Sequence, residues 1–366
     1  LLGGNSLYQM ISVCHTDKGK QLFARHLTER SMSETEREQR CGAIAELAQK
    51  PEFAVEFETA GRRMESEREK FDAEAFEDFC QDPAQGKLPG FAHVLRIVLP
   101  ILEIAGLIAF LGGAVSYGYP LVGFLILLVV SWLTRFLTDS VIQPVCYASN
   151  VSGAYEDMLS LIAGQDFASG ILAQMRQQAG GTAGAVKAYH KLKAISQAYN
   201  ISFNPLVHQI LCGFLLWDYQ LAAIVSKWKK KYGAQVAGCS DMLAELEDLM
   251  SFSVLGMVRD TGDSTIDYKQ DQVYLEGTDV YHPLLVPGQA QGNDVMLRSG
   301  ITIITGSNMS GKTTFLRTIA INLVLAYLGA PVCAKRLHAS NMRIFTSMRV
   351  KDDVAHGIST FYAEIL

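Results

Sequence analysis

The sequence predicts a mixed fold, in which a largely helical chain is interrupted by an apolar helical hairpin and followed by an α/β nucleotide-binding domain. Three observations indicate this. A phosphate-loop motif occupies residues 306–314, thirty residues from 104 to 133 carry no formal charge, and the segments on both sides of that run have charged, helix-like patterns. A chain of 366 residues suggests two or three structural units and can bury a substantial core.

Helices are expected before and after the apolar run. Ser33-Glu-Thr-Glu36 is typical of a capping box and opens a helix that should reach Leu47. After the run, residues 147–175 and 186–199 are expected to be helices, separated by the glycines of residues 180–184. Asn204-Pro205 then predicts the start of a long helix.

The apolar run has the length of two membrane spans. Ile97–Ser116 and Leu121–Leu137 each approach the roughly 20 residues that cross a bilayer core, and Ser116-Tyr-Gly-Tyr-Pro120 forms a break between them. Lys87, Arg96 and Arg135 flank the two ends. The positive-inside rule then places both ends, and the bulk of the chain, on the cytoplasmic side of a membrane.

The alternative is that the two apolar helices form the core of a soluble bundle. Glu103 and Pro100 lie inside the first helix, and a carboxylate is costly in lipid. A soluble helix pair would, however, have polar residues at every third or fourth position, which together form a polar face. Residues 104–133 show no such pattern. The membrane interpretation is therefore favoured.

Charge and cysteine content limit the possible partners and sites. The net charge is −5 and the pI is about 5.9, so no global basic field attracts nucleic acid. The basic run Lys227-Trp-Lys-Lys-Lys231 is short and is interpreted as a solvated helix end with one anchoring aromatic residue. The seven cysteines contain no C-x-x-C pair, which argues against a metal site or a disulfide framework.

The most specific motif is the segment Gly306–Thr314, which has the spacing G-x-x-x-x-G-K-[ST]. The apolar residues 301–305 predict a buried strand that enters the loop, and residues 315–328 predict the helix that leaves it. ATP is the expected cofactor, with Lys312 on the β/γ-phosphates and Thr313 as the ligand of Mg²⁺. The expected nucleotide-binding residues are Gly306, Ser307, Asn308, Met309, Ser310, Gly311, Lys312, Thr313 and Thr314.

Some residues inside this loop are not required by the general phosphate-loop motif and are therefore more informative about the family. Thr305–Thr314, with Asn308-Met309, resembles the loop of the MutS family of mismatch-repair ATPases. Further segments that resemble this family are Gly4–Met10, Thr16–Leu27 with its T-x-x-G-x-x-L pattern, Asn204–Met257, His282-Pro-Leu-Leu285, Phe315–Asn322 and Ser347–Ile365. The resemblance is specific from about residue 280 onward and looser before it.

The resemblance implies a domain order. The expected segments are core helices in 1–90, the hairpin in 91–140, returning core helices in 141–260, and the N-terminal part of an ABC-like ATPase domain in 261–366. In the family, an acidic strand that carries a Mg²⁺-associated Asp and a water-orienting Glu follows shortly after the last of these segments. The chain is therefore expected to be a fragment that binds ATP, although only the complete protein would be an efficient ATPase.

The resemblance also implies a homodimer in which each nucleotide site is completed in trans. The matching residues are Ser359, flanked by Gly357 and Thr360, and a serine hydroxyl is a suitable donor to a γ-phosphate. Lys312 and Ser359 are thus the expected catalytic residues.

Three functional classes remain open. The first is a membrane-anchored MutS-like ATPase that acts on DNA or a partner, the second a soluble DNA-binding MutS relative with the hairpin as core, and the third a membrane-linked ABC-like ATPase without a DNA role. No segment resembles the mismatch-reading domain with its Phe-x-Glu wedge, and the hairpin occupies the place of the lever helices. No aromatic residue suited to stacking on adenine lies just upstream of Asn293.

Overall fold

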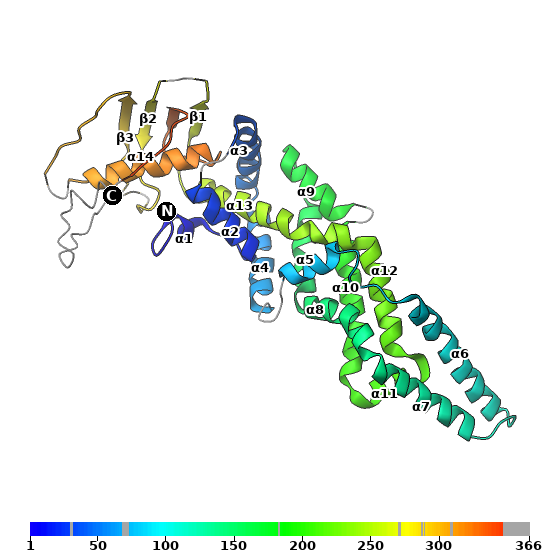
Figure 1. Cartoon of the computed structure of the whole chain (residues 1–366). Helices are drawn as coiled ribbons and strands as arrows, with labels where there is room; N and C mark the ends of the chain where they lie inside the picture. Colours follow the sequence, from blue (N-terminus) through cyan, green and yellow to red (C-terminus); the bar gives the residue numbers. More distant parts are fainter. Residues whose placement is uncertain are drawn as a thin grey trace, which may run out of the picture. The chain divides into compact units, whose positions relative to one another are not determined.

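The computed structural model describes residues 1–29, 32–67, 73–181, 184–269, 272–286, 288, 290–307 and 310–346. The described chain is mostly helical with one small mixed sheet (Figure 1). It divides into two compact units. The first comprises Leu1–Ser31 and Glu38–Met257, and the second comprises Met32–Arg37 and Val258–Leu366.

The first unit is built from helices alone in its described part. They are α1 (Leu7–Ile11), α2 (Asp17–Thr28), α3 (Glu34–Ala48, whose first turn belongs to the second unit), α4 (Pro51–Glu67), α5 (Ala73–Gln81), α6 (Gly90–Leu111), α7 (Gly118–Leu133), α8 (Arg135–Gly164), α9 (Gly170–Gly180), α10 (Ala185–Asn200), η1 (Ile201–Phe203), α11 (Pro205–Leu215), α12 (Trp217–Ala237) and α13 (Cys239–Val258). The capping box is confirmed, since the Ser33 hydroxyl accepts a hydrogen bond from Glu36 N at 3.3 Å.

The T-x-x-G pattern at the start of α2 has a direct structural reason. Thr16 is the N-cap, and its hydroxyl accepts from Gly19 N at 2.9 Å. The fully buried Glu247 of α13 accepts hydrogen bonds from the backbone N–H groups of His15 and Thr16 at 3.0 and 3.1 Å. A Cβ on Gly19 would lie 2.0 Å from a carboxylate oxygen of Glu247. Only glycine fits beside this buried carboxylate.

The predicted hairpin is confirmed as two helices in contact, α6 and α7, joined by residues 112–117 (Figure 1). The turn begins earlier than expected, because Pro120 lies in the first turn of α7, where its missing N–H costs nothing. Large apolar side chains on both helices are exposed, for example Ile101 at 60% and Trp132 at 75%. The hairpin is therefore not the buried core of this chain.

By length and composition, α6 is the one described helix that could cross a membrane unaided. The number of spans rises to as many as three if each of two bent helix pairs counts as one. These pairs are α7 with the start of α8 (Arg135–Cys146), bent by 64°, and α11 with the segment Trp217–Val258, which comprises α12 and α13, bent by 81°.

The long helix predicted from Asn204 is broken at Leu216, which has φ +49° and ends α11. The Asn204 side chain caps α11 as expected, accepting from Leu206 N at 3.1 Å. Helix α11 packs against both α6 and α7, and its outward side chains, such as Ile210, are exposed. The structure thus adds a third apolar helix to the hairpin.

The basic run at residues 227–231 lies inside α12 and not at a helix end, which corrects the sequence interpretation. The anchoring role of the aromatic residue is confirmed. Trp228 is buried, stacks on Phe76, and donates from Nε1 to Ala188 O at 2.9 Å. Lys229 Nζ donates to the carbonyls of Asp82 and Gln85, both at 2.7 Å. Trp228 and Lys229 are therefore used in packing within the first unit.

The second unit contains a four-stranded sheet in the order β1-β4-β2-β3. Its strands are β1 (Asp263–Asp267), β2 (Tyr274–Val280), β3 (Asn293–Arg298) and β4 (Arg336–Ser340), and the helix α14 (Lys312–Tyr327) contacts β1 and β2. Strand β4 pairs in parallel with β1 and antiparallel with β2, and β2 pairs antiparallel with β3.

The expected buried strand at residues 301–305 is wrong for the described structure. These residues form no strand, and Ile301 is 94% exposed. A strand is stabilised by hydrogen bonds to a neighbouring strand, and none of the four described strands pairs with this segment.

Candidate nucleotide-binding site

The described part of the phosphate loop leads directly into α14, which confirms the predicted helix. The helix begins at Lys312, three residues before the predicted start, and Gly311 is its N-cap with φ +87°. That conformation is disfavoured for residues with a side chain. The loop therefore meets the positive end of the helix dipole, where backbone N–H groups lack partners within the helix. Asn308 and Met309 lie outside the described residues.

Lys312 folds back over the loop. Its Nζ donates to Gly306 O at 2.7 Å and to Ser307 O at 2.6 Å. Gly306 permits this compact shape, because a Cβ there would lie 2.7 Å from Ser310 Oγ. The ammonium group is held above exposed backbone, where phosphate oxygens could replace the two carbonyls as its acceptors.

Thr313 and Thr314 occupy the first turn of α14, and both are exposed. The Thr314 carbonyl accepts from Thr318 Oγ1 at 2.8 Å, which is an interaction within the helix. Gly306, which has little room for a side chain, Gly311, whose φ of +87° favours glycine, the lysine and the helix N-terminus together fit the phosphates of a nucleotide. The Thr313 hydroxyl could ligate its Mg²⁺.

The His282-Pro283 turn lies beside α14. His282 Nδ1 accepts from Leu284 N at 3.2 Å, so the ring carries its proton on Nε2 when neutral. Burial, and then the positive charge of Arg317, lower the pKa of His282 below its usual value. The His282 ring therefore serves as an acceptor for a backbone N–H in this turn, and its lowered pKa favours the neutral form that this role requires.

Asn322 connects this turn to α14 and to the segment before β4. The side chain is fully buried, and its Nδ2 donates to Tyr281 O at 3.1 Å and to Thr318 O at 2.9 Å. Its Oδ1 accepts from Cys333 N at 2.7 Å. The sequence placed Asn322 only in a helix. The one available signal was an amide on an otherwise apolar helix face.

Arg37 is a second residue that sequence reasoning missed. It is buried, and its guanidinium donates to Ala326 O at 2.7 Å and to Ser264 O at 2.9 Å. The contacts join the segment Met32–Arg37 to the C-terminal end of α14 and to β1, although hundreds of residues separate them in the chain.

The expected trans residues Gly357, Ser359 and Thr360 lie outside the described residues. The site that the structure describes is thus the phosphate loop with its helix, together with the turn and the asparagine that support them.

Comparisons with known proteins match part of the chain. The family model for MutS domain V matches residues 302–366. The DNA mismatch repair protein MutS of Natronomonas pharaonis is 34% identical over 128 residues, which is 34% of this chain and 14% of that protein. MutS of Brevibacillus brevis is 30% identical over 41% of this chain and 18% of its own length. MutS of Staphylococcus saprophyticus is 29% identical over 49% of this chain and 21% of its own length.

The chain thus matches about a fifth or less of the length of these relatives. The domain V match contains the phosphate loop whose geometry is described above, and the three relatives are all named DNA mismatch repair protein MutS. Residues 302–366 therefore match MutS domain V, and over part of its length the chain is similar to MutS proteins, as a divergent or partial relative of them.

Proposed function

We propose that this protein binds ATP and Mg²⁺ at the phosphate loop and uses nucleotide binding to control the association of two copies. The observation that carries the proposal is the placement of Lys312 over Gly306 and Ser307 at the N-terminus of α14. Charge, backbone donors and helix dipole all favour an anion at this point.

Each residue of the site would have a distinct role that follows from its chemistry. Lys312 would exchange its two carbonyl acceptors for β- and γ-phosphate oxygens, and the N–H groups of the loop and first turn would hold the remaining charge. Thr313 would contribute a hydroxyl to Mg²⁺, which supplies charge neutralisation on the phosphates when bound. Ser359, flanked by Gly357 and Thr360, is the proposed donor to the γ-phosphate of the opposite copy, and ATP-dependent dimer formation tests that role.

Membrane anchoring is the second part of the proposal. Helix α6 has 22 residues and so measures about 33 Å, enough for a hydrocarbon core of about 30 Å. Apolar side chains of α6, α7 and α11 are exposed in the described structure. A lipid environment would cover all three helices at once. The nucleotide-binding unit would then face the cytoplasm, where ATP is available.

A DNA role is a weaker part of the proposal. The relatives are named DNA mismatch repair proteins, which makes DNA a partner to test. The net charge is −5, and two residues of the basic run in α12, Trp228 and Lys229, are used for packing. We therefore favour a membrane-anchored MutS-like ATP-binding protein that acts on DNA or on a protein partner, over a soluble repair protein or an ABC-like ATPase without a DNA role. Duplex DNA binding that weakens with rising salt would support the DNA branch.

The nucleotide site is tested by Lys312→Ala, with Lys269→Ala as the control because Lys269 is an exposed lysine that follows β1 and is not part of the loop. We expect Lys312→Ala to remove most of the affinity for Mg·ATP and the control to retain it, measured by calorimetry on folded protein. Equal affinity in the wild type and Lys312→Ala would refute the assignment.

A further inference from the structure

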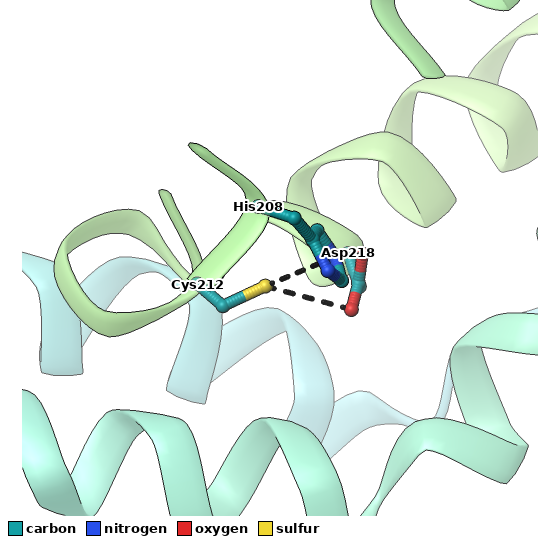
Figure 2. Close-up of side chains that lie close together, drawn as sticks. All are labelled: His208, Cys212 and Asp218. Atoms are coloured by element: carbon teal, nitrogen blue, oxygen red, sulfur yellow. Dashed lines mark hydrogen bonds and ion pairs between the residues drawn. The ribbon is translucent and has the colours of Figure 1, made fainter. Parts of the chain in front are cut away.

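Three metal-ligating side chains meet where α11 ends and α12 begins (Figure 2). His208 Nε2 lies 2.9 Å from Asp218 Oδ1, and Cys212 Sγ lies 3.3 Å from His208 Nε2. Cys212 Sγ also lies 3.6 Å from Asp218 Oδ2. Figure 2 shows the thiol, the imidazole and the carboxylate pointing toward one another.

The geometry differs from that of a nucleophilic triad. In a triad, the base contacts the nucleophile through one ring nitrogen and its orienting carboxylate through the other. Here the thiol and the carboxylate both approach Nε2 of His208, and that nitrogen carries at most one proton. Three ligand atoms that converge on one point match the requirement of a cation.

The surroundings form a built site and not an exposed surface cluster. Cys212 and Asp218 are buried, while the His208 side chain is 26% exposed, which leaves one side open for entry. Ser131 of α7 supplies a fourth polar group, with its hydroxyl 3.4 Å from Asp218 Oδ2. The site therefore includes two helices of the bent pair and one helix of the hairpin.

We propose that His208, Cys212 and Asp218 bind a divalent cation of the zinc class, with water or the Ser131 hydroxyl in the fourth position. Zn²⁺ binds sulfur at about 2.3 Å and nitrogen or oxygen at about 2.0–2.2 Å, so tetrahedral ligand atoms lie about 3.3–3.6 Å apart. The two distances from the thiol already fall in this range. The histidine–carboxylate pair would open by a few tenths of an ångström.

Charge and ligand type support the same class of ion. A thiolate, a carboxylate and a neutral imidazole balance a divalent cation to zero net charge, which suits an apolar environment. Mg²⁺ and Ca²⁺ prefer sets of oxygen ligands, whereas sulfur and imidazole together select zinc and similar ions. Binding would release the Cys212 proton to solvent and leave the His208 proton on Nδ1, with no change in oxidation state.

The position of the site suggests its role. Leu216 lies between the ligands in a left-handed conformation that is disfavoured for a residue with a side chain. His208 and Cys212 precede this residue and Asp218 follows it. A bound cation would fix the bend between α11 and α12 and attach it to α7.

The full chain, in detergent where it requires one, is to be stripped with chelator and titrated with Co²⁺ as the spectroscopic probe. We expect one Co²⁺ per chain, a thiolate-to-metal charge-transfer band and the visible bands of a tetrahedral site. Cys212→Ser should abolish the charge-transfer band and Asp218→Asn should weaken binding about tenfold or more. Cys41→Ser should change neither, because Cys41 is an exposed thiol on α3.

A second measurement uses the wild-type chain, so it does not depend on the folding of a variant. Zn²⁺ should slow the alkylation of Cys212, followed by peptide mass spectrometry, and should leave the alkylation of Cys41 unchanged. A Co²⁺ band that survives Cys212→Ser would overturn the proposal. So would the absence of stoichiometric Co²⁺ together with unchanged Cys212 alkylation, which would make the cluster a set of hydrogen bonds only.

Discussion

Asn322 shows how much can depend on one buried amide. It provides two donors and one acceptor to three separate backbone groups, and an unpaired buried backbone group costs about 1–3 kcal/mol. The His282-Pro283 turn and the segment before β4 keep their places beside α14 through this side chain. Its effect on the nucleotide site is therefore one of positioning.

Asn322→Leu should lower the free energy of unfolding of the second unit by about 1–3 kcal/mol, because it leaves Tyr281 O and Cys333 N without their partner. Denaturant unfolding followed by a probe in that unit measures the change. Asn341→Leu is the control, since Asn341 is exposed. Equal stabilities of the two variants would contradict the role given to Asn322.

His15 gives the first unit a pH-dependent contact. Its Nε2 lies 2.9 Å from Glu58 and its Nδ1 lies 3.2 Å from Glu65. Burial alone would lower the pKa of His15, but the hydrogen bonds and charges of these glutamates outweigh it and raise the pKa above its usual value. The pKa values of both glutamates are lowered, with His15 and basic neighbours opposing the effect of burial.

Because the folded-state pKa of His15 is raised, its contribution to stability is full below about pH 6.5 and is lost as the pH rises through the raised value. The first unit should therefore become less stable as pH rises above this value. His15→Gln should remove that dependence, whereas His93→Gln, at an exposed position, should retain it. Thermal unfolding across this pH range tests the expectation, and identical profiles for wild type and His15→Gln would contradict it.

Single residues were predictable where local chemistry decides their role. Lys312 and Thr16 follow from short motifs, and the structure places the first over a phosphate loop and the second at a helix N-cap. Asn322 and Cys212 gain their roles from residues that only the tertiary fold brings near them. For Cys212 the sequence offers one signal, because His208 and Cys212 are four residues apart on one helix. That spacing does not indicate Asp218, which lies beyond the helix break at Leu216.

At the scale of elements, helices with strong patterns were predictable and breaks were not. The hairpin, α14 and the capped start of α3 follow from apolar length, the phosphate loop and a capping box. The predicted helix over residues 147–175 is instead the end of α8 and the start of α9, separated by residues 165–169. Such breaks depend on packing between helices, which periodicity along one helix does not report.

The contact between α6 and α7 depends on one glycine. Glu103 is buried against α7, and a Cβ on Gly123 would lie 1.9 Å from its Oε2. The other carboxylate oxygen of Glu103 has no hydrogen-bond partner within the described residues. The carboxylate that the sequence analysis identified as costly in lipid is thus buried between the two helices.

Gly123→Val should destabilise the hairpin by about 1–3 kcal/mol, because the added side chain forces Glu103 out of its place. Gly106→Val is the matched control, since a Cβ on Gly106 of α6 meets no atom within 4 Å. Adding Glu103→Ala to Gly123→Val should restore part of the loss. Thermal unfolding in detergent measures all four proteins, and equal effects at both glycines would argue against the contact.

At the scale of the whole molecule, the chain joins the unit that carries the phosphate-loop motif to helices with exposed apolar side chains. The structure changes how anchoring is best tested. A deletion of residues 97–137 would uncover the face of α11 that packs on α7 and would remove the first turn of α8. Substitutions of exposed side chains on α6 and α7 preserve these contacts, so they test membrane anchoring more specifically than the deletion does.

The intact protein should remain with membranes after alkaline carbonate extraction and should require detergent for release. Replacing Ile101, Leu125 and Trp132 by glutamate should shift it toward the soluble fraction, because a charge at the bilayer centre costs about 2.5–3.5 kcal/mol. Replacing the exposed Val55 of α4 by glutamate is the control and should change nothing. Intact protein that is soluble and monodisperse without detergent would refute the anchoring.

The uncovered segment at residues 301–305 has a practical consequence for every association assay on this chain. None of the four described strands pairs with this segment, and its exposed β-branched side chains make it suited to strand addition by another molecule. Two copies could therefore adhere through this edge in the absence of any nucleotide. Self-association that does not depend on ATP and persists in Lys312→Ala should be assigned to this segment. Ile303→Lys should suppress that self-association without affecting ATP-dependent dimer formation.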